Sequence, residues 1–128
     1  MVRSYKNNMI TGASPMGLVL ISYDLLIKSL DQAKLATEQQ DFEHESEFIG
    51  RAARVITDLR YALDMEKGGE ISQNLASLYH FMTQRLLEGQ AKDTVKAIED
   101  VRKLAASLRE AWQAVANQEH PVAYAVGA

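Results

Sequence analysis

Four stretches of the chain carry apolar residues at the three- and four-residue spacing of an amphipathic helix. The first starts at Ser14-Pro15, because a serine hydroxyl can cap a helix and proline has no N–H to leave unpaired in the first turn. It runs to about Gln40, which predicts a helix on the order of 39 Å long at ~1.5 Å per residue. Its apolar stripe is wide: Leu18, Val19, Ile21, Tyr23, Leu25, Leu26 and Leu30.

Three further helices are predicted after it. Asp41 is a suitable N-cap for the second, and we expect the Gly68-Gly69 pair to end that helix. We expect Gly89 to loosen the end of the third helix and Asp93 to cap the fourth. The three stripes are Phe48, Ala52, Ile56, Leu59, Leu63; Ile71, Leu75, Leu78, Met82, Leu86; and Val95, Ile98, Val101, Ala105, Leu108, Trp112, Val115.

Long helices joined by short connections predict an all-α fold, an antiparallel up-down four-helix bundle over residues 15–118. The chain has two prolines, Pro15 and Pro121, so nothing between them breaks a helix at proline. A strict heptad repeat is absent, which favours a globular bundle over a long coiled coil. Residues 119–128 are predicted to be a flexible tail.

Composition narrows the classes of function. A net charge of −3 without a basic stripe argues against binding to nucleic acid. The longest apolar run, from Met16 to Ile27, is interrupted by Ser22 and Asp24, so we expect no insertion into a membrane. The sequence has no cysteine and no signal-peptide layout at its start, and both features suit a cytoplasmic protein.

The residues offer little for catalysis. A di-metal site in a helical bundle needs two Glu-x-x-His pairs, and none of the three histidines has a glutamate three positions before it. Asp41 and His44 have this spacing but stand alone, and no glycine pattern of a phosphate-binding loop is present. We therefore expect no catalytic residue, no metal and no cofactor. A metal-dependent bundle enzyme is the alternative, and stoichiometric metal in the purified protein would support it.

Two longer stretches and one short motif carry a family resemblance. "SYKNNMITGASPMGLVLISYDLLIKSL" and "LDMEKGGEISQNLASLYHFMTQRLLEG" resemble the opening and the central block of the FliS family of flagellar export chaperones, and "LREAW" resembles its closing motif. The matches follow the family's order and spacing over residues 5–115. The resemblance implies a four-helix bundle preceded by a small mobile cap over residues 1–14.

The resemblance also implies a function and partners. Members of this family bind the disordered C-terminal segment of flagellin in the bacterial cytosol, prevent premature polymerisation and help deliver the subunit to the flagellar type III export gate. An anti-sigma factor is a further candidate partner, and a monomer or weak homodimer is expected. The alternative is a helical secretion chaperone or regulatory interaction module for a different flagellar client.

The family motif assigns site residues by position. The expected cap and helix entry comprise Ala13, Ser14 and Pro15. Leu75 and Leu78 are equally consistent with bundle core, since helical periodicity alone does not separate the two roles. The expected client-binding residues are Tyr5, Ile10, Tyr23, Asp24, Asn74, Leu75, Leu78, Tyr79 and Met82.

The chain departs from the family pattern at several positions of the site. Gly12 stands where threonine is usual, and His80 stands where an acidic residue is typical. Ser22 takes the place of a large apolar residue, while Leu25 and Leu26 follow the Tyr-Asp pair where small residues are favoured. These changes leave the predicted fold intact and put the contact set and the client in question.

Overall fold

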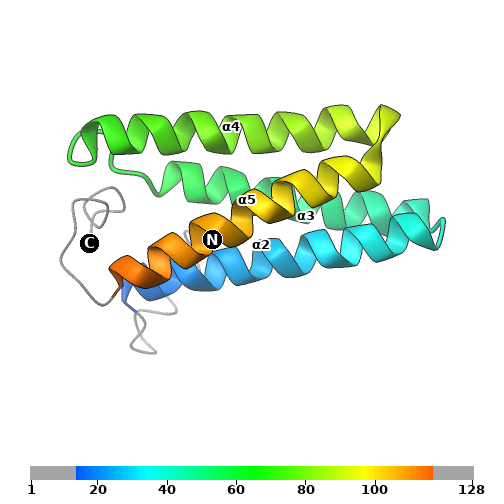
Figure 1. Ribbon diagram of the computed structural model, residues 1–128, viewed down its shortest axis with the longest axis horizontal. Coiled ribbons are helices and arrows are strands. Elements are labelled where there is room, and N and C mark those ends of the chain that lie inside the picture. The colour runs from blue at the N-terminus through cyan, green and yellow to red at the C-terminus, as the bar shows by residue number, and fades with distance from the viewer. Residues whose placement is uncertain (1–13, 117–128) are drawn as a thin grey trace.

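The chain folds into an antiparallel bundle of long helices, as the sequence predicts. The computed structural model describes residues 14–116, apart from the side chain of Ala91, and the regular elements in that range are all α-helices. They are α2 (Pro15–Glu38), α3 (Phe42–Tyr61), α4 (Gly69–Lys92) and α5 (Thr94–Val115). Successive helices run in opposite directions, and both α2 and α4 pack against α3 and α5 (Figure 1). The expected cap residues up to Ala13 and the tail 119–128 lie outside the described residues.

Three helix starts are fixed by local capping. The Ser14 hydroxyl accepts a hydrogen bond from the Gly17 N–H at 3.0 Å, and Pro15 occupies the first helical position of α2. Asp41 and Asp93 cap α3 and α5 in the same manner, each accepting from the N–H three residues later. These starts agree with the sequence prediction because they depend on residues within one turn of each other.

The Gly68-Gly69 pair does not end the second helix, so that prediction is wrong. α3 already ends at Tyr61, and residues 62–68 form a turn organised by Asp64. The Asp64 carboxylate accepts from the N–H groups of residues 66 and 67, and its carbonyl accepts the Ser72 hydroxyl at 2.8 Å. The glycines open α4 instead, and Gly69 adopts a φ of +49°, which glycine reaches without steric cost.

Gly89 does not loosen the end of the third helix either. α4 continues past it to Lys92, and Gly89 is buried against the start of α5. A Cβ atom at this position would lie 2.1 Å from the Cβ of Ala97, so only glycine allows the two helices to approach so closely. The residue is needed for the α4–α5 crossing, which the sequence of α4 alone cannot reveal.

A ladder of ion pairs sets the register between α2 and α5. Asp24 pairs with Arg109, Asp31 with Arg102 at 2.6 Å, and Lys34 with Glu99 at 3.3 Å. Residue numbers rise by seven and then three along α2 while they fall by seven and then three along α5, as antiparallel helices in register require. All three pairs are solvent-exposed, so they specify alignment more than they stabilise the fold.

We expect Gly89→Ala to lower the free energy of unfolding by about 1–3 kcal/mol, because the new methyl group overpacks the crossing with Ala97. The intrinsic preference of helices for alanine, roughly 1 kcal/mol, offsets part of the cost. Urea denaturation measures the difference.

The matched control is Gly50→Ala on α3. A Cβ atom there meets only the end of the Arg54 side chain, at 3.5 Å. This variant should be as stable as the wild type or more stable by up to about 1 kcal/mol. Equal stability of the two alanine variants would contradict the role assigned to Gly89.

Candidate functional site

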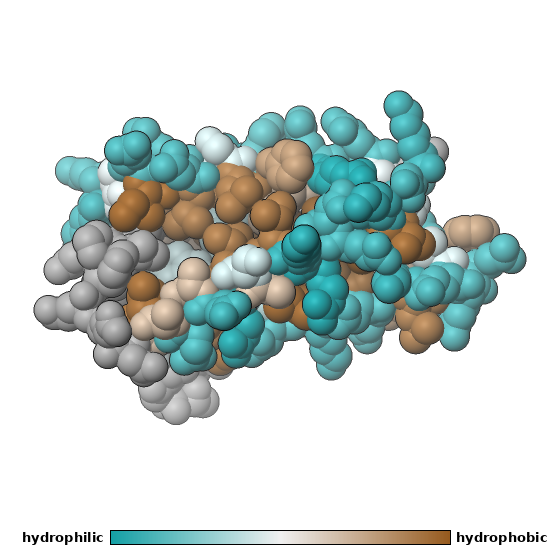
Figure 2. Space-filling view, in the orientation of Figure 1, coloured by the Kyte–Doolittle hydropathy of each residue, from teal (hydrophilic) through white to brown (hydrophobic). Residues whose placement is uncertain are grey.

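An apolar face lies between α4 and α5, at the end of the bundle where α4 begins and α5 ends. Figure 2 shows hydrophobic side chains gathered there between polar borders. The residues that form this α4–α5 face are only partly buried and pack against the hydrophobic core beneath them. They are Ile71, Leu75 and Leu78 on α4, and Leu104, Leu108 and Val115 on α5.

The face is open because the two helices diverge. α5 crosses the bundle obliquely: it lies close to α4 near their connection and close to α2 at its C-terminal end (Figure 1). Near the connection, Gly89 meets Ala97, and the Arg85 guanidinium binds the Asp100 carboxylate at 3.1 Å. Lys96 adds a second cation to Asp100, also at 3.1 Å. The closed end therefore anchors the helices while the other end exposes their apolar sides.

Three large polar-tipped side chains meet in the interior of the same part of the bundle. The Tyr23 and Tyr79 hydroxyls share a hydrogen bond of 2.5 Å, and the Trp112 indole N–H donates to the Tyr23 hydroxyl at 3.2 Å. All three side chains are at most 2% exposed and come from α2, α4 and α5. Buried polar atoms that satisfy one another hold their helices at fixed separations, because displacement of one helix leaves a partner unpaired.

Burial governs the ionisation of this aromatic trio. It raises the pKa of Tyr79 to about 12, since the charged form loses its hydration. Burial also raises the pKa of Tyr23, and repulsion and hydrogen bonding from Tyr79 add to that rise. Both hydroxyls are therefore neutral near pH 7 and act as structural hydrogen-bonding groups.

The structure separates the predicted client-binding residues into three groups. Tyr23, Tyr79 and Met82 are buried in the core. Leu75 and Leu78 reach the α4–α5 face and also touch the core, so both of the roles left open by the sequence are met in part. The remaining predicted residues are Asn74, which is exposed, Asp24, which is exposed and bound by Arg109, and Tyr5 and Ile10, which lie outside the described residues.

Sequence reasoning missed the contribution of α5 to this face. It assigned Leu108 and Val115 to the core stripe and did not single out Leu104. The signal was present, because these residues form a second apolar row beside the buried row of Val101, Ala105 and Trp112. A helix with two adjacent apolar rows has more apolar surface than one bundle core covers.

Other kinds of site find no support in the described part of the chain. Residues 14–116 contain no group of three His, Asp or Glu side chains placed to hold a metal ion. No helix in that range is long and apolar enough to cross a membrane. Two cavities between α3 and α4 and one near the α2–α3 turn have few charged groups, and none of the three holds a catalytic arrangement of nucleophile and base.

Tyr79→Phe should lower the free energy of unfolding by about 1–3 kcal/mol, because the Tyr23 hydroxyl loses its hydrogen bond to residue 79 and is buried away from water. The loss should also depend on pH. Wild-type stability is complete below pH ~10, the ordinary tyrosine value, and falls as the pH rises towards about 12. The variant lacks one of the two tyrosines whose pKa is raised. Its free energy of unfolding, measured by urea titration, should therefore fall less steeply over this pH range.

Tyr61→Phe is the control for removal of one hydroxyl, since its ring is 78% exposed. It should unfold like the wild type at neutral pH. A Tyr79→Phe protein with wild-type stability would show that the trio does not hold the helices together.

Comparison with known proteins identifies the family. The chain matches the model of the FliS family, described as flagellar protein FliS, over residues 1–119. It is 36% identical over 107 residues to the flagellar secretion chaperone FliS of Salmonella typhimurium, which covers 83% of this chain and 79% of that protein. The corresponding protein of Vibrio cholerae is 30% identical over 114 residues, covering 89% and 84%.

A third relative extends the pattern. The flagellar secretion chaperone FliSB of Pseudomonas aeruginosa is 30% identical over 108 residues, which cover 84% of this chain and 86% of that protein. The names of these relatives describe secretion chaperones and not enzymes. With an all-helical bundle, an open apolar face and a family match over nearly its full length, this chain belongs to the FliS family of flagellar secretion chaperones.

Proposed function

We propose that this protein acts in the cytoplasm by binding the disordered C-terminal segment of flagellin on the α4–α5 face. The observation that carries the proposal is the divergence of α4 and α5, which leaves apolar rows of both helices partly uncovered. An amphipathic helix of the client fits such a groove by placing its own apolar side chains between the two rows. Binding is stoichiometric and needs no cofactor.

The physics of a disordered client explains why the site is a broad face. A segment that folds on binding loses conformational entropy, so it needs wide apolar contact to offset that cost. Covering the assembly segment of flagellin would prevent premature polymerisation until the subunit is delivered to the flagellar export gate. The chaperone scaffold stays fixed meanwhile, because its core is closed by the aromatic trio.

The residues assigned from the family motif take different parts in this proposal. Leu75 and Leu78 contact the client directly, and Asn74 on the exposed side of α4 offers an amide to the client backbone. Tyr23, Tyr79 and Met82 form the rigid floor that positions those contacts. Asp24 acts through its pair with Arg109, which aligns α2 with the half of α5 that carries the face.

The segment before Ser14 serves as a cover in the same proposal. An uncovered apolar face promotes aggregation, and a short segment with few contacts can protect it and be displaced by a better ligand. Tyr5, Ile10 and Ala13 would supply the contacts of that cover. Gly12 widens the backbone freedom of the segment and so weakens its docking compared with threonine.

One observation favours the alternative of a different flagellar client. Leu25, which follows the Tyr-Asp pair where the family favours a small residue, is 42% exposed on α2, and Ile21 one turn before it is 52% exposed. This adds apolar surface outside the α4–α5 face. A protein other than flagellin recovered with the chaperone from its own bacterium, and bound by the purified chain, would support this alternative.

Replacing both Leu75 and Leu78 by glutamine should weaken binding of the flagellin C-terminal segment by about 10–100-fold. Each leucine buries apolar area against the client, and full burial of one such side chain stabilises by about 1.5–3 kcal/mol. Calorimetry with the isolated segment measures the affinity, and circular dichroism confirms that the variant retains its helices.

Leu87→Gln is the matched control, because Leu87 is 56% exposed on the same helix and is not part of the face. It should bind like the wild type. Flagellin lacking its C-terminal segment should not bind at all, and undiminished binding of that truncated client would refute the proposed function.

Deleting residues 1–13 should leave the bundle folded, because Ser14 remains as the N-cap of α2. If those residues cover the α4–α5 face, the deletion should increase the fluorescence of a dye that binds exposed apolar surface. It should also tighten flagellin binding, since the client no longer competes with the cover. A truncated chain with unchanged dye fluorescence would rule the cover out.

A further inference from the structure

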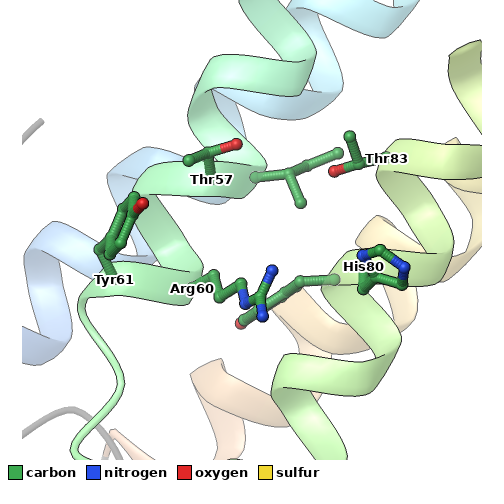
Figure 3. A pocket seen from close by; sticks show the side chains of 7 residues that line it. Thr57, Arg60, Tyr61, His80 and Thr83 are labelled. Atoms are coloured by element: carbon green, nitrogen blue, oxygen red, sulfur yellow. The ribbon is translucent and has the colours of Figure 1, made fainter.

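A second concave site lies on the other flank of α4, between α3 and α4. Figure 3 shows the Arg60 and Thr57 side chains of α3 facing His80 and Thr83 of α4 across it. The cavity measures about 260 Å³ and continues past Arg60 and His80 to Ser77. We call this site the α3–α4 groove. It shares α4 with the apolar face but uses the opposite side of the helix.

The groove contains a cation without a carboxylate partner. No acidic residue lines it, and no hydrogen bond or ion pair joins the Arg60 side chain to any residue between 14 and 116. Arg85, Arg102 and Arg109 differ from it, since each binds an aspartate. A guanidinium is a planar fork that matches a carboxylate through two parallel hydrogen bonds, so the free Arg60 is suited to one from outside.

The other lining groups fit the same ligand. The Thr83 hydroxyl points into the groove in Figure 3 and makes no hydrogen bond to a described residue, so it is free to donate. The Thr57 hydroxyl is already used, because it donates to the Ala53 carbonyl at 2.9 Å. The floor is apolar: Ile56 is 1% exposed, and Tyr79 engages its hydroxyl with Tyr23 inside the core.

The shape and lining of the groove favour a peptide side chain as the occupant. The cavity of about 260 Å³ beside Thr83 is continued past Arg60 and His80 by one of about 300 Å³, so the groove is elongated along α4. An apolar floor with a cation and a hydroxyl at its wall accommodates a short methylene stem that ends in a carboxylate. Aspartate and glutamate have that form.

The two sites on α4 lie within reach of one peptide. Leu75 and Leu78 project towards α5, while His80 and Thr83 project towards α3. A helix with its side chains is about 10–12 Å across, and an extended chain covers roughly 3.3 Å per residue. The path around half of the helix circumference is roughly 16–19 Å, so about five or six extended residues are enough to pass over α4 from the face to the groove.

We propose that the α3–α4 groove is a second binding site for the client, in which Arg60 pairs with the carboxylate of an acidic side chain in an extended part of the segment. Thr83 donates a further hydrogen bond to that carboxylate. This inference rests on the proposed function, since it takes the client of the α4–α5 face as its ligand. The apolar face supplies the contact area, and the groove fixes the register of the bound segment.

The test compares Arg60→Gln with the wild type in calorimetry against the flagellin C-terminal segment. Loss of the charged pair should weaken binding about tenfold. The wild-type affinity should fall more steeply with added salt than that of the variant, because one fewer ion pair is screened in the variant. Arg60→Lys should restore only part of the affinity, since lysine keeps the charge but not the fork.

Arg54→Gln is the matched control, because it removes the same charge from an exposed position of α3 that does not line the groove. It should bind like the wild type. Thermal unfolding of Arg54→Gln should match the wild type. That of Arg60→Gln should fall only slightly, since Arg60 is exposed but lies in the last turn of α3, where a cation is favoured by the helix dipole.

A double-mutant cycle identifies the acidic partner. Each aspartate or glutamate of the segment is changed in turn to its amide and titrated into wild-type and Arg60→Gln protein. One of these changes should weaken binding to the wild type about tenfold and leave binding to the Arg60→Gln variant unchanged.

The outcomes separate the two proposals. A wild-type chain that does not bind the segment overturns the proposed function and this inference together. A wild-type chain that binds, with Arg60→Gln equal to Arg54→Gln and no acidic residue coupled to Arg60, overturns the inference alone.

Discussion

The hydrogen-bonded contact of Tyr23, Tyr79 and Trp112 is the constraint on which the rest of the structure depends. These side chains are too large and too polar to be buried unless each finds a partner, and they find one another from three helices. α4 and α5 diverge in the part of the bundle that contains Tyr79 and Trp112, so direct packing between those two helices is reduced there. The trio links both to α2 and keeps the gap between them at a fixed width.

This constraint explains why α4 can expose two flanks without detaching. At its C-terminal half, Gly89 and the Arg85–Asp100 pair hold it to α5. At its N-terminal half the trio and the Asp64-centred turn hold it, the latter through the Ser72 hydroxyl. Between these anchors, the side of α4 facing α5 presents leucines, and the side facing α3 presents His80 and Thr83 opposite Arg60 of α3. α4 is thus a ridge between one apolar and one cationic surface.

The sequence predicts those parts of the fold that depend on neighbouring residues. Ser14, Asp41 and Asp93 could be recognised as caps because each acts on the N–H three residues later. The roles of Gly68-Gly69 and Gly89 could not, since they are decided by a side-chain-organised turn and by a contact with another helix. A glycine in a sequence can indicate that a Cβ atom would clash at that position, but it does not show which neighbouring residue causes the clash.

The site was predictable to a similar depth. Periodicity places Leu75, Leu78 and Met82 on one side of a helix, yet only the packing of α5 decides that Met82 is enclosed while the leucines stay partly open. Pairing across helices was also out of reach, because Asp24 and Arg109 are far apart in the chain. Apolar residues in two adjacent rows, as on α5, are the one signal from which the face could have been inferred.

Three of the positions at which this chain departs from the family pattern fall into two physical classes. Ser22 and Leu26 are buried in α2, and the Ser22 hydroxyl donates to the Leu18 carbonyl, so these changes alter packing inside the bundle. His80 instead borders the α3–α4 groove opposite Arg60. An acidic side chain, typical of the family at this position, would place a negative charge beside the guanidinium and compete with any external carboxylate. Histidine places no carboxylate there, which is the condition that the proposed pairing of Arg60 with an external carboxylate requires.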